Sequence, residues 1–250
     1  MALPVRPVAG TQREPVPGVW EPAAVGGSMT PYYQDEAAGI TIYHGDCREI
    51  APTLGLGFAV VSDPPYGVGW AFTSQGSGRN AQGGTRSITK GLHVFGDTEP
   101  FDPTPWLAYP VVVLWGMHHF PEKLCRGSVL VWVKKYPDAY GTFLSDADIA
   151  WMKGGCGVYI SPTVNPASFQ SEKAHPTQKP VSIMEWCIER ARTPLDATVL
   201  DPFMGSGTTL VAAKNLGRRA IGIEIEERYC EIAVERLSQG VLDLSPAVET

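Results

Sequence analysis

Short apolar runs recur along the chain and alternate with stretches whose apolar positions follow a helical period. The runs lie at 40–44, 58–62, 111–115, 129–133, a ribbon near 149–160, 198–201 and 220–225. Continuous apolar runs are typical of strands in a sheet that is covered on both faces. The segments 181–192 and 226–237 have the spacing of amphipathic helices. The pattern predicts one α/β domain built on a mostly parallel sheet of about seven strands.

The run at 58–62 ends abruptly in Asp63-Pro64-Pro65-Tyr66. Proline cannot donate to a strand ladder, so the backbone must leave the sheet at this point. In open α/β sheets, ligands bind at the carboxyl ends of the strands. A carboxylate and a carbonyl can accept the two N–H bonds of an exocyclic amine such as adenine N6, while a tyrosine ring stacks on the base. Taken alone, the same four residues are equally compatible with a plain proline-rich turn.

A second stretch, 199–213, has the pattern of a short strand, a glycine turn and the start of a helix. Gly205 and Gly207 let the backbone pass close to a ligand. The stretch lacks the Lys-Ser/Thr pair of a P-loop and the third glycine of a dinucleotide fingerprint, which disfavours a nicotinamide cofactor. The candidates for capping the following helix are its hydroxyl side chains, Ser206, Thr208 and Thr209. About twenty residues on, the run at 220–225 carries Glu224, where an acid usually holds a ribose diol.

Three motifs in a fixed order resemble one enzyme family. The sequence DPPY at 63–66 precedes HPTQKP at 175–180 and DPFMGSGTT at 201–209. This order resembles the permuted β class of the amino-methylating DNA methyltransferases, which use S-adenosylmethionine and occur in phages and in restriction-modification systems. The resemblance covers about Met29 to Gln239. It implies a seven-stranded, Rossmann-like methyltransferase sheet with circularly permuted motifs and an antiparallel last hairpin.

The resemblance also assigns roles to individual residues. It implies a catalytic role for Asp63, Pro64, Pro65 and Tyr66. It implies cofactor binding by Asp46, Asp63, Thr177, Lys179, Asp201, Pro202, Phe203, Gly205, Ser206, Gly207, Thr208 and Glu224. Asp46 would lie near the adenine of the cofactor, although it is also a good helix N-cap. Lys179 would contact the methionine end, although a plain surface lysine remains an alternative.

The function implied is site-specific methylation of adenine N6 in double-stranded DNA, on a base rotated out of the helix. Cytosine-N4 methylation is the nearest alternative, although that group more often carries Ser at the position of Asp63. Further alternatives are amide methylation of a protein glutamine, and a DNA-binding relative that has lost turnover. The resemblance also implies a homodimer in the cytoplasm of a bacterium or a phage-infected cell.

Composition adds three exclusions. A net charge of −6, with 44% apolar and 18% charged residues, argues against a non-specific nucleic-acid coat protein. The five cysteines are scattered and include no C-x-x-C pair, which disfavours disulfides and a zinc site, and we expect no metal. No run approaches the roughly 20 apolar residues that a membrane span requires.

The chain divides into three parts by composition. We expect residues 1–28 to be a disordered Pro/Gly-rich extension, 29–240 to be the methyltransferase domain, and 241–250 to be a frayed tail. Within the domain, 67–96 is long, glycine-rich and basic, which predicts a mobile loop that closes over the base or the DNA. The resemblance places a target-recognition segment at about 136–173. Its candidate base-reading residues are Asn165, Ser168 and Gln170.

Overall fold

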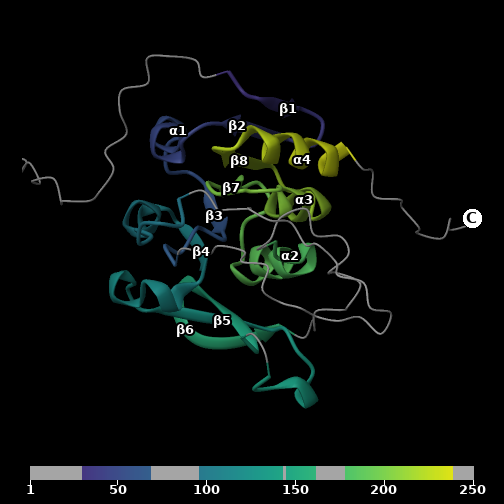
Figure 1. Ribbon diagram of the computed structural model, residues 1–250. Helices are drawn as coiled ribbons and strands as arrows, with labels where there is room; N and C mark the ends of the chain where they lie inside the picture. The colour runs from purple at the N-terminus through teal and green to yellow at the C-terminus, as the bar shows by residue number, and fades with distance from the viewer. Residues whose placement is uncertain (1–29, 69–95, 143–144, 162–177, 239–250) are drawn as a thin grey trace, which may run out of the picture.

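The computed structural model describes residues 30–68, 96–142, 145–161 and 178–238. These residues form an eight-stranded sheet in the order β1-β2-β8-β7-β3-β4-β6-β5 (Figure 1). The strands are β1 (Tyr33–Asp35), β2 (Ile40–His44), β3 (Ala59–Ser62), β4 (Val111–Trp115), β5 (Gly127–Val133), β6 (Ala147–Ser161), β7 (Val199–Asp201) and β8 (Ala220–Glu224). The α-helices are α1 (Cys47–Leu54), α2 (Val181–Arg190), α3 (Thr208–Asn215) and α4 (Glu227–Ser238). Short 3-10 turns occupy η1 (Thr104–Ala108), η2 (Met117–His119), η3 (Pro121–Lys123) and η4 (Pro137–Ala139).

The five central strands β2, β8, β7, β3 and β4 run parallel, so their carboxyl ends meet at one edge of the sheet. β1 is antiparallel to β2, and β6 is antiparallel to β4 and β5. The predicted α/β class, mostly parallel sheet and antiparallel last hairpin are therefore confirmed.

The connections change direction between β7 and β3. From β7 the chain continues to β8 on one side, and from β3 it continues to β4 on the other. In an open α/β sheet this is the topological switch point, where the diverging connections leave a crevice for a ligand. The two motifs predicted to be functional follow these same two strands.

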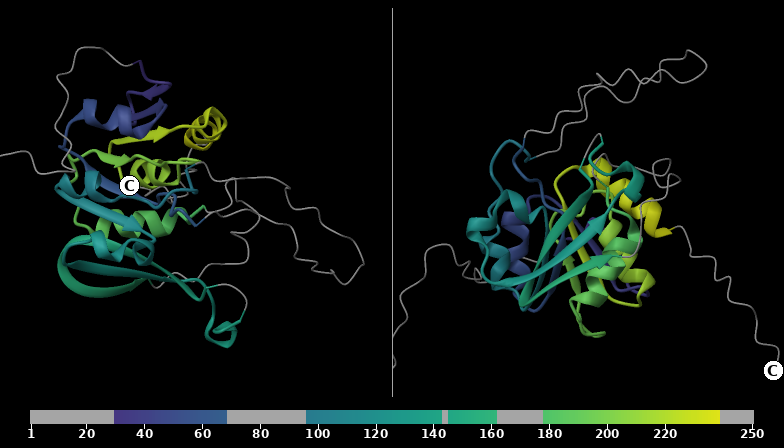
Figure 2. Two further views of the ribbon diagram at one scale, coloured as in Figure 1. Left: turned by 60° about the vertical axis from the view of Figure 1, so that its left-hand side comes forward. Right: turned by 90° about the horizontal axis from the view of Figure 1, so that it is seen from below.

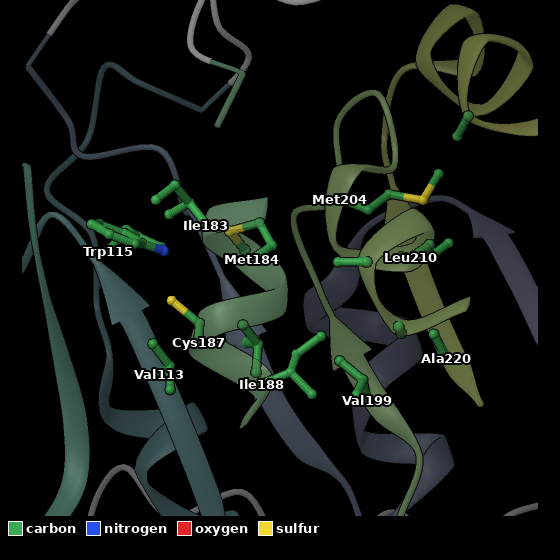
Figure 3. Close-up of a cluster of buried hydrophobic side chains, with 14 of the residues drawn as sticks. Val113, Trp115, Ile183, Met184, Cys187, Ile188, Val199, Met204, Leu210 and Ala220 are labelled. Atoms are coloured by element: carbon green, nitrogen blue, oxygen red, sulfur yellow. The ribbon is translucent and has the colours of Figure 1, made fainter. Parts of the chain in front are cut away.

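Helices cover both faces of the sheet, α1 on one side and α2, α3 and α4 on the other (Figure 2). Neighbouring residues of one strand enter opposite cores: Val61 packs with α2 and α3, whereas Val60 packs with α1. Figure 3 shows part of the first core, where Ile183, Met184 and Cys187 of α2 face the sheet. Each fully buried aliphatic side chain contributes about 1.5–3 kcal/mol to stability. These cores fix the strand ends that carry the site.

The structure corrects three sequence-based expectations. The sheet has eight strands and not seven, because Tyr33-Gln34-Asp35 adds an edge strand with no apolar run to reveal it. The ribbon near 149–160 is one longer strand, β6, which bends at Gly154 and Gly155 so that β5 pairs with both halves. The hydroxyl residues do not cap α3, since its N-cap is Gly207 in the left-handed region, without a side-chain cap.

Several predicted segments fall outside the described residues: the extension 1–28, the tail 241–250, most of the loop 67–96, and Asn165, Ser168 and Gln170. Within the described residues, no helix is both long and apolar enough to span a membrane.

Candidate active site

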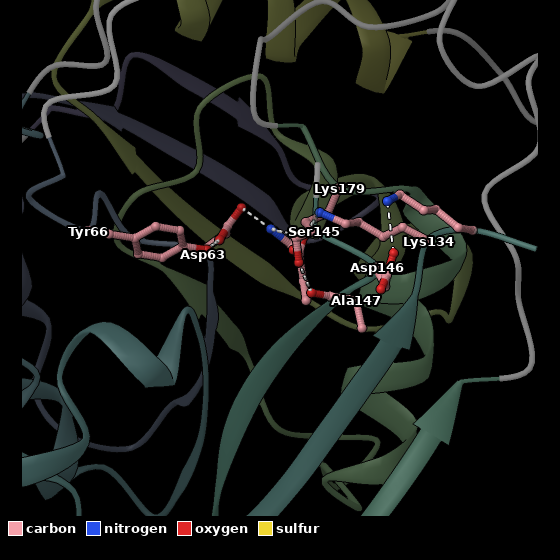
Figure 4. A network of polar contacts seen from close by, with 9 residues as sticks. Asp63, Tyr66, Lys134, Ser145, Asp146, Ala147 and Lys179 are labelled. Carbon is pink, nitrogen blue, oxygen red and sulfur yellow. Dashed lines mark hydrogen bonds and ion pairs between the residues drawn. The ribbon is translucent and has the colours of Figure 1, made fainter. Parts of the chain in front are cut away.

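Asp63 lies at the carboxyl end of β3 and holds two partners. Its Oδ2 accepts a hydrogen bond from Lys179 Nζ at 2.8 Å. Its Oδ1 accepts a short hydrogen bond from the Tyr66 hydroxyl (Figure 4). Lys179, predicted at the cofactor's methionine end, is only 7% exposed and therefore not a surface lysine. The first and last residues of DPPY and the lysine of HPTQKP thus form one charged cluster.

The Lys179 ammonium also lies near a second carboxylate and an aromatic ring. Asp148 Oδ2 is 3.6 Å from Lys179 Nζ, and the Trp115 ring centre is 5.2 Å away. Burial by itself would lower the pKa of Lys179, but the carboxylates of Asp63 and Asp148 outweigh it and leave the pKa raised. Lys179 is therefore a buried, charged group.

The Tyr66 ring packs against two residues that follow β4. It stacks on His119 with ring centres 4.8 Å apart and an interplanar angle of 18°. Gly116 has φ +74°, and a Cβ built there would lie 2.1 Å from Tyr66 Cε1. Burial, and then the charge of Asp63, raises the pKa of Tyr66 well above its usual value, which keeps the hydroxyl protonated. Only glycine at 116 leaves room for this ring position.

The turn after DPPY is held by Asp97, which is 4% exposed. Its Oδ1 accepts the backbone N–H groups of Tyr66, Gly67 and Val68 at 3.0, 2.8 and 3.3 Å. Sequence reasoning missed this residue, because it lies 31 positions beyond Tyr66 and belongs to no motif.

Asp201 joins three elements at the end of β7. Its Oδ1 accepts from Ser62 Oγ of β3 at 2.6 Å and from Phe203 N at 3.1 Å, and its Oδ2 accepts from Thr209 Oγ1 of α3 at 2.5 Å. Burial raises the pKa of Asp201 to about 6 despite these hydrogen bonds. Thr209 therefore binds Asp201 instead of capping its own helix.

The glycine turn is held from two sides. Gly205 N donates to Glu224 Oε2 at 2.9 Å, and Glu226 N donates to Glu224 Oε1 at 2.8 Å. Burial raises the pKa of Glu224. Both carboxylate oxygens of Glu224 thus support the backbone, and its ribose contact stays a prediction.

On the other side, Arg236 of α4 reaches the turn. Its Nη1 donates to Ser206 O at 2.6 Å, to Ser206 Oγ at 3.0 Å and to Thr208 Oγ1 at 3.1 Å. Ser206 Oγ in turn donates to Gln178 Oε1 at 3.2 Å. The sequence motifs did not reveal Arg236, whose helix pattern is that of an ordinary amphipathic segment.

A cavity opens at the switch point, with about 370 Å³ of empty space that includes open solvent. Its lining contains seven predicted site residues: Asp63, Lys179, Asp201, Phe203, Gly205, Ser206 and Thr208. It also contains four that were not predicted: Gln178, Met184, Met204 and Thr209. Charged, amide and thioether groups beside a phenyl ring suit a ligand with both a charged and an apolar part.

The remaining predicted residues lie outside this lining. They are Asp46, Pro64, Pro65, Tyr66, Pro202, Gly207 and Glu224, whereas Thr177 falls outside the described residues. Asp46 is the N-cap of α1, accepting from Arg48 N at 2.8 Å, so this alternative role is confirmed. Its hydrogen bond with the Arg48 side chain lowers the pKa of Asp46.

The described residues contain no group of three or more metal-ligating side chains placed to hold an ion. The five cysteines are free, and Cys47, Cys187 and Cys230 are buried. Burial raises the pKa of Cys47 and of Cys230 to about 12, so neither is a thiolate at neutral pH.

Known proteins match this chain in sequence and in fold. A family model for N6/N4 methyltransferases, described as DNA methylase, matches residues 119–235. The match covers just under half of the chain, and over that part the chain is similar to the N6/N4 DNA methyltransferases. The type II methyltransferase M.ScaI of Streptomyces caespitosus is 27% identical, with 83% of each chain covered. M2.LlaDCHI of Lactococcus lactis is 54% identical over 66 residues, but the match spans only 24% of that relative.

Two solved structures show the same fold as this chain. The complex of M1.HpyAVI with S-adenosylmethionine has a TM-score of 0.51 at 24% identity, covering 79% of this chain and 99% of the other. The DNA modification methylase TTHA0409 of Thermus thermophilus has a TM-score of 0.50 at 22% identity, covering 82% and 96%. The predicted Rossmann-like methyltransferase fold is therefore confirmed.

Proposed function

We propose that this protein is a member of the N6/N4 DNA methyltransferase family and that it transfers a methyl group from S-adenosylmethionine to the N6 amine of adenine in double-stranded DNA. The observation that carries the proposal is the placement of Asp63 at the edge of the switch-point cavity, with Pro64 and Tyr66 directly after it. The order of the three motifs and the match to the family model support the same reaction.

The cavity residues fit the cofactor. Bound S-adenosylmethionine supplies an electrophilic methyl group to an amine nitrogen. The Lys179 ammonium at the cavity wall suits a carboxylate, the Phe203 ring suits an apolar or aromatic portion, and the turn at Gly205 lets the backbone come close. The proposed cofactor set is completed by Asp46, Pro202, Gly207 and Glu224, which lie outside this lining, and by Thr177, which falls outside the described residues.

Asp63 and Pro64 act on the target base. A carboxylate oxygen of Asp63 and the carbonyl of Pro64 accept the two N–H bonds of the amine, which localises its lone pair on nitrogen. Tyr66 stacks on the base, which has been rotated out of the helix. The amine loses one proton on methylation, and Asp63 is the nearest carboxylate to accept it and pass it to solvent. Holding two reactants in line contributes as much as about 7–11 kcal/mol to catalysis.

The same clamp fits the N4 amine of cytosine, so the identity of the base needs a direct measurement. The acid at position 63 favours adenine. We expect a methylation-free bacterial host that expresses the chain to carry N6-methyladenine at one recurring DNA motif, read by single-molecule sequencing. Detection of N4-methylcytosine instead would show that cytosine is the target base. If the protein is expressed in soluble form but the genome carries neither modified base, both reactions are rejected.

Light scattering of the purified protein tests the homodimer that the resemblance implies.

Replacing Asp63 by alanine tests the assignment of the acceptor. We expect methyl transfer to fall by at least about 100-fold, because the amine loses a charged acceptor in the transition state. The Kd for S-adenosylhomocysteine, measured by calorimetry, should change far less, because the other cavity residues remain. Retained turnover in the Asp63→Ala variant would overturn the assignment.

A further inference from the structure

Asp148 is a half-buried acid that belongs to none of the three motifs. It lies at the start of β6, and its side chain is 29% exposed. Lys134 Nζ donates to its Oδ1 at 2.7 Å, and Lys179 Nζ lies 3.6 Å from its Oδ2. Burial by itself would raise the pKa of Asp148, but Lys179 and Lys134 outweigh it and leave the pKa lowered. Asp148 is therefore a carboxylate with a lysine on each side.

The four groups alternate in charge from Asp63 through Lys179 and Asp148 to Lys134. In this arrangement Lys179 occupies Oδ2 of Asp63, and Tyr66 occupies Oδ1. Each oxygen of an ionised carboxylate can accept a further donor, but the Asp63 side chain is only 18% exposed, so a base amine that donates to it comes up against one of these two donors. Tyr66 lies three residues along the same turn from Asp63 and is packed against His119 and Gly116, so Lys179 is the donor that can give way.

Moving Lys179 off Asp63 would take from a buried cation its nearest carboxylate, which is strongly unfavourable unless another acceptor replaces it. Asp148 removes this obstacle, because its Oδ2 is already just beyond hydrogen-bond distance of the same ammonium. A small rotation of the lysine exchanges one carboxylate for the other. The cluster then keeps its charge balance while Asp63 Oδ2 becomes available.

We propose that Asp148 is a positioning residue for methyl transfer, which accepts the Lys179 ammonium when the amine of the target base takes its place at Asp63. This inference rests on the proposed role of Asp63 as the acceptor of that amine. It predicts that Asp148 acts through Lys179 and that Lys134 is not required.

A double-mutant cycle tests the coupling. Single-turnover methyl transfer to unmethylated genomic DNA is measured for wild type, Asp148→Asn, Lys179→Gln and the double variant. We expect Asp148→Asn to slow transfer on the order of tenfold in the presence of Lys179, the size of a typical coupling between contacting residues. In the Lys179→Gln background the same change should have less than about a twofold effect. A purely structural role would slow both backgrounds by the same factor and would overturn the inference.

Two matched controls come from the same edge of the sheet. Asp146 pairs with Lys135 at 2.8 Å and does not contact Lys179, so Asp146→Asn should leave the rate within about twofold of wild type. Lys134→Gln should also leave the rate within about twofold, since Asp148 keeps its charge and can still receive Lys179. A Lys134→Gln variant on the order of tenfold slower than wild type would show that the Lys134 pair matters instead. That result would overturn the inference even if Asp148→Asn fails to fold.

A measurement on the free protein separates this inference from the proposed function. Nuclear magnetic resonance of lysine labelled with ¹³C at Cε follows the titration of Lys179. Asp148→Asn should lower the pKa of Lys179, and Asp146→Asn should leave it unchanged. An unchanged pKa in Asp148→Asn overturns the inference. Wild-type protein that methylates neither base overturns the proposed function and this inference with it, whereas an Asp148→Asn variant as active as wild type overturns the inference alone.

Discussion

At the scale of single residues, the site depends on what can stand next to Tyr66. Gly116 approaches the ring face so closely that a Cβ would overlap it, and its φ of +74° favours glycine independently. Both constraints arise because Gly116 directly follows β4, where the chain turns next to Tyr66. The apolar run of β4 did not predict a contact with DPPY. Gly116 is therefore a structural requirement of the proposed base clamp.

Replacing Gly116 by alanine should both destabilise the protein and disturb Tyr66. The left-handed conformation alone costs a residue with a Cβ roughly 1–2 kcal/mol, and the overlap with the ring adds to this. Gly141→Ala is a matched control, since Gly141 has φ +72° and no atom within 4 Å of a built Cβ. Urea unfolding should show the larger loss for Gly116→Ala, and only that variant should lose methyl transfer. Equal losses in the two variants would contradict the ring contact.

At the scale of secondary-structure elements, the two functional turns are held by residues from elsewhere in the chain. Asp97 collects three backbone N–H groups of the turn after β3, and Arg236 of α4 binds the glycine turn after β7. Neither turn is stabilised by its own motif alone. The strand ends give the motifs their position, and these distant side chains give them their conformation.

Asp97→Ala should lower the free energy of unfolding by at least about 2 kcal/mol, because buried N–H groups lose their acceptor. Asp97→Asn keeps one side-chain oxygen as an acceptor and should lose less. Chemical denaturation of the two variants measures the difference. If the alanine and asparagine variants are equally stable, the hydrogen bonds to Asp97 are not the cause of the loss of stability.

Arg236→Met should weaken cofactor binding while the helix stays folded. Methionine keeps an apolar stem but loses the three hydrogen bonds to Ser206 and Thr208, which form part of the cavity wall. We expect the Kd for S-adenosylhomocysteine, measured by calorimetry, to rise on the order of tenfold, the effect of losing a charged hydrogen-bond donor. Arg228→Met on the same helix is the control, since Arg228 pairs with Glu226 and not with the turn. The prediction fails if both variants bind equally well.

At the scale of the whole molecule, Asp201 connects β3, β7 and α3 at the switch point, so its ionisation affects the stability of the fold. Its pKa is about 6 in the folded protein and near 3.8 when exposed. Between these values the folded state binds more protons than the unfolded state, and stability therefore falls as pH rises from about 4 to about 6. Above about pH 7 this contribution stays constant.

Urea unfolding of wild type and Asp201→Asn across pH 4 to 7 isolates this effect. Asparagine has nearly the same shape but does not titrate in this range. We expect the stability of wild type relative to the variant to fall by about 2 kcal/mol between pH 4 and 6, since one unit of pKa shift corresponds to about 1.4 kcal/mol and part of the change lies outside this range. A difference that does not change with pH would show that burial of Asp201 leaves its pKa unshifted.

The sequence by itself determined the α/β class, the main strands and helices, and the motif residues at two strand ends. These features depend on neighbouring residues: apolar runs, prolines that end a strand, and glycines that allow a turn. Seven residues predicted from the motifs therefore line the cavity that the structure contains. The short strand β1 escaped prediction, because three residues with one aromatic side chain carry no periodic signal.

Only the tertiary structure decided which residues complete the site. Lys179 meets Asp63 across 116 positions of sequence, Asp97 lies 31 positions from the turn it holds, and Arg236 lies 30 positions from Ser206. Asp148 joins the charged cluster from the antiparallel strand β6, which belongs to none of the motifs. Such contacts follow from strand order and from the placement of helices on the sheet, which local patterns of polarity do not encode.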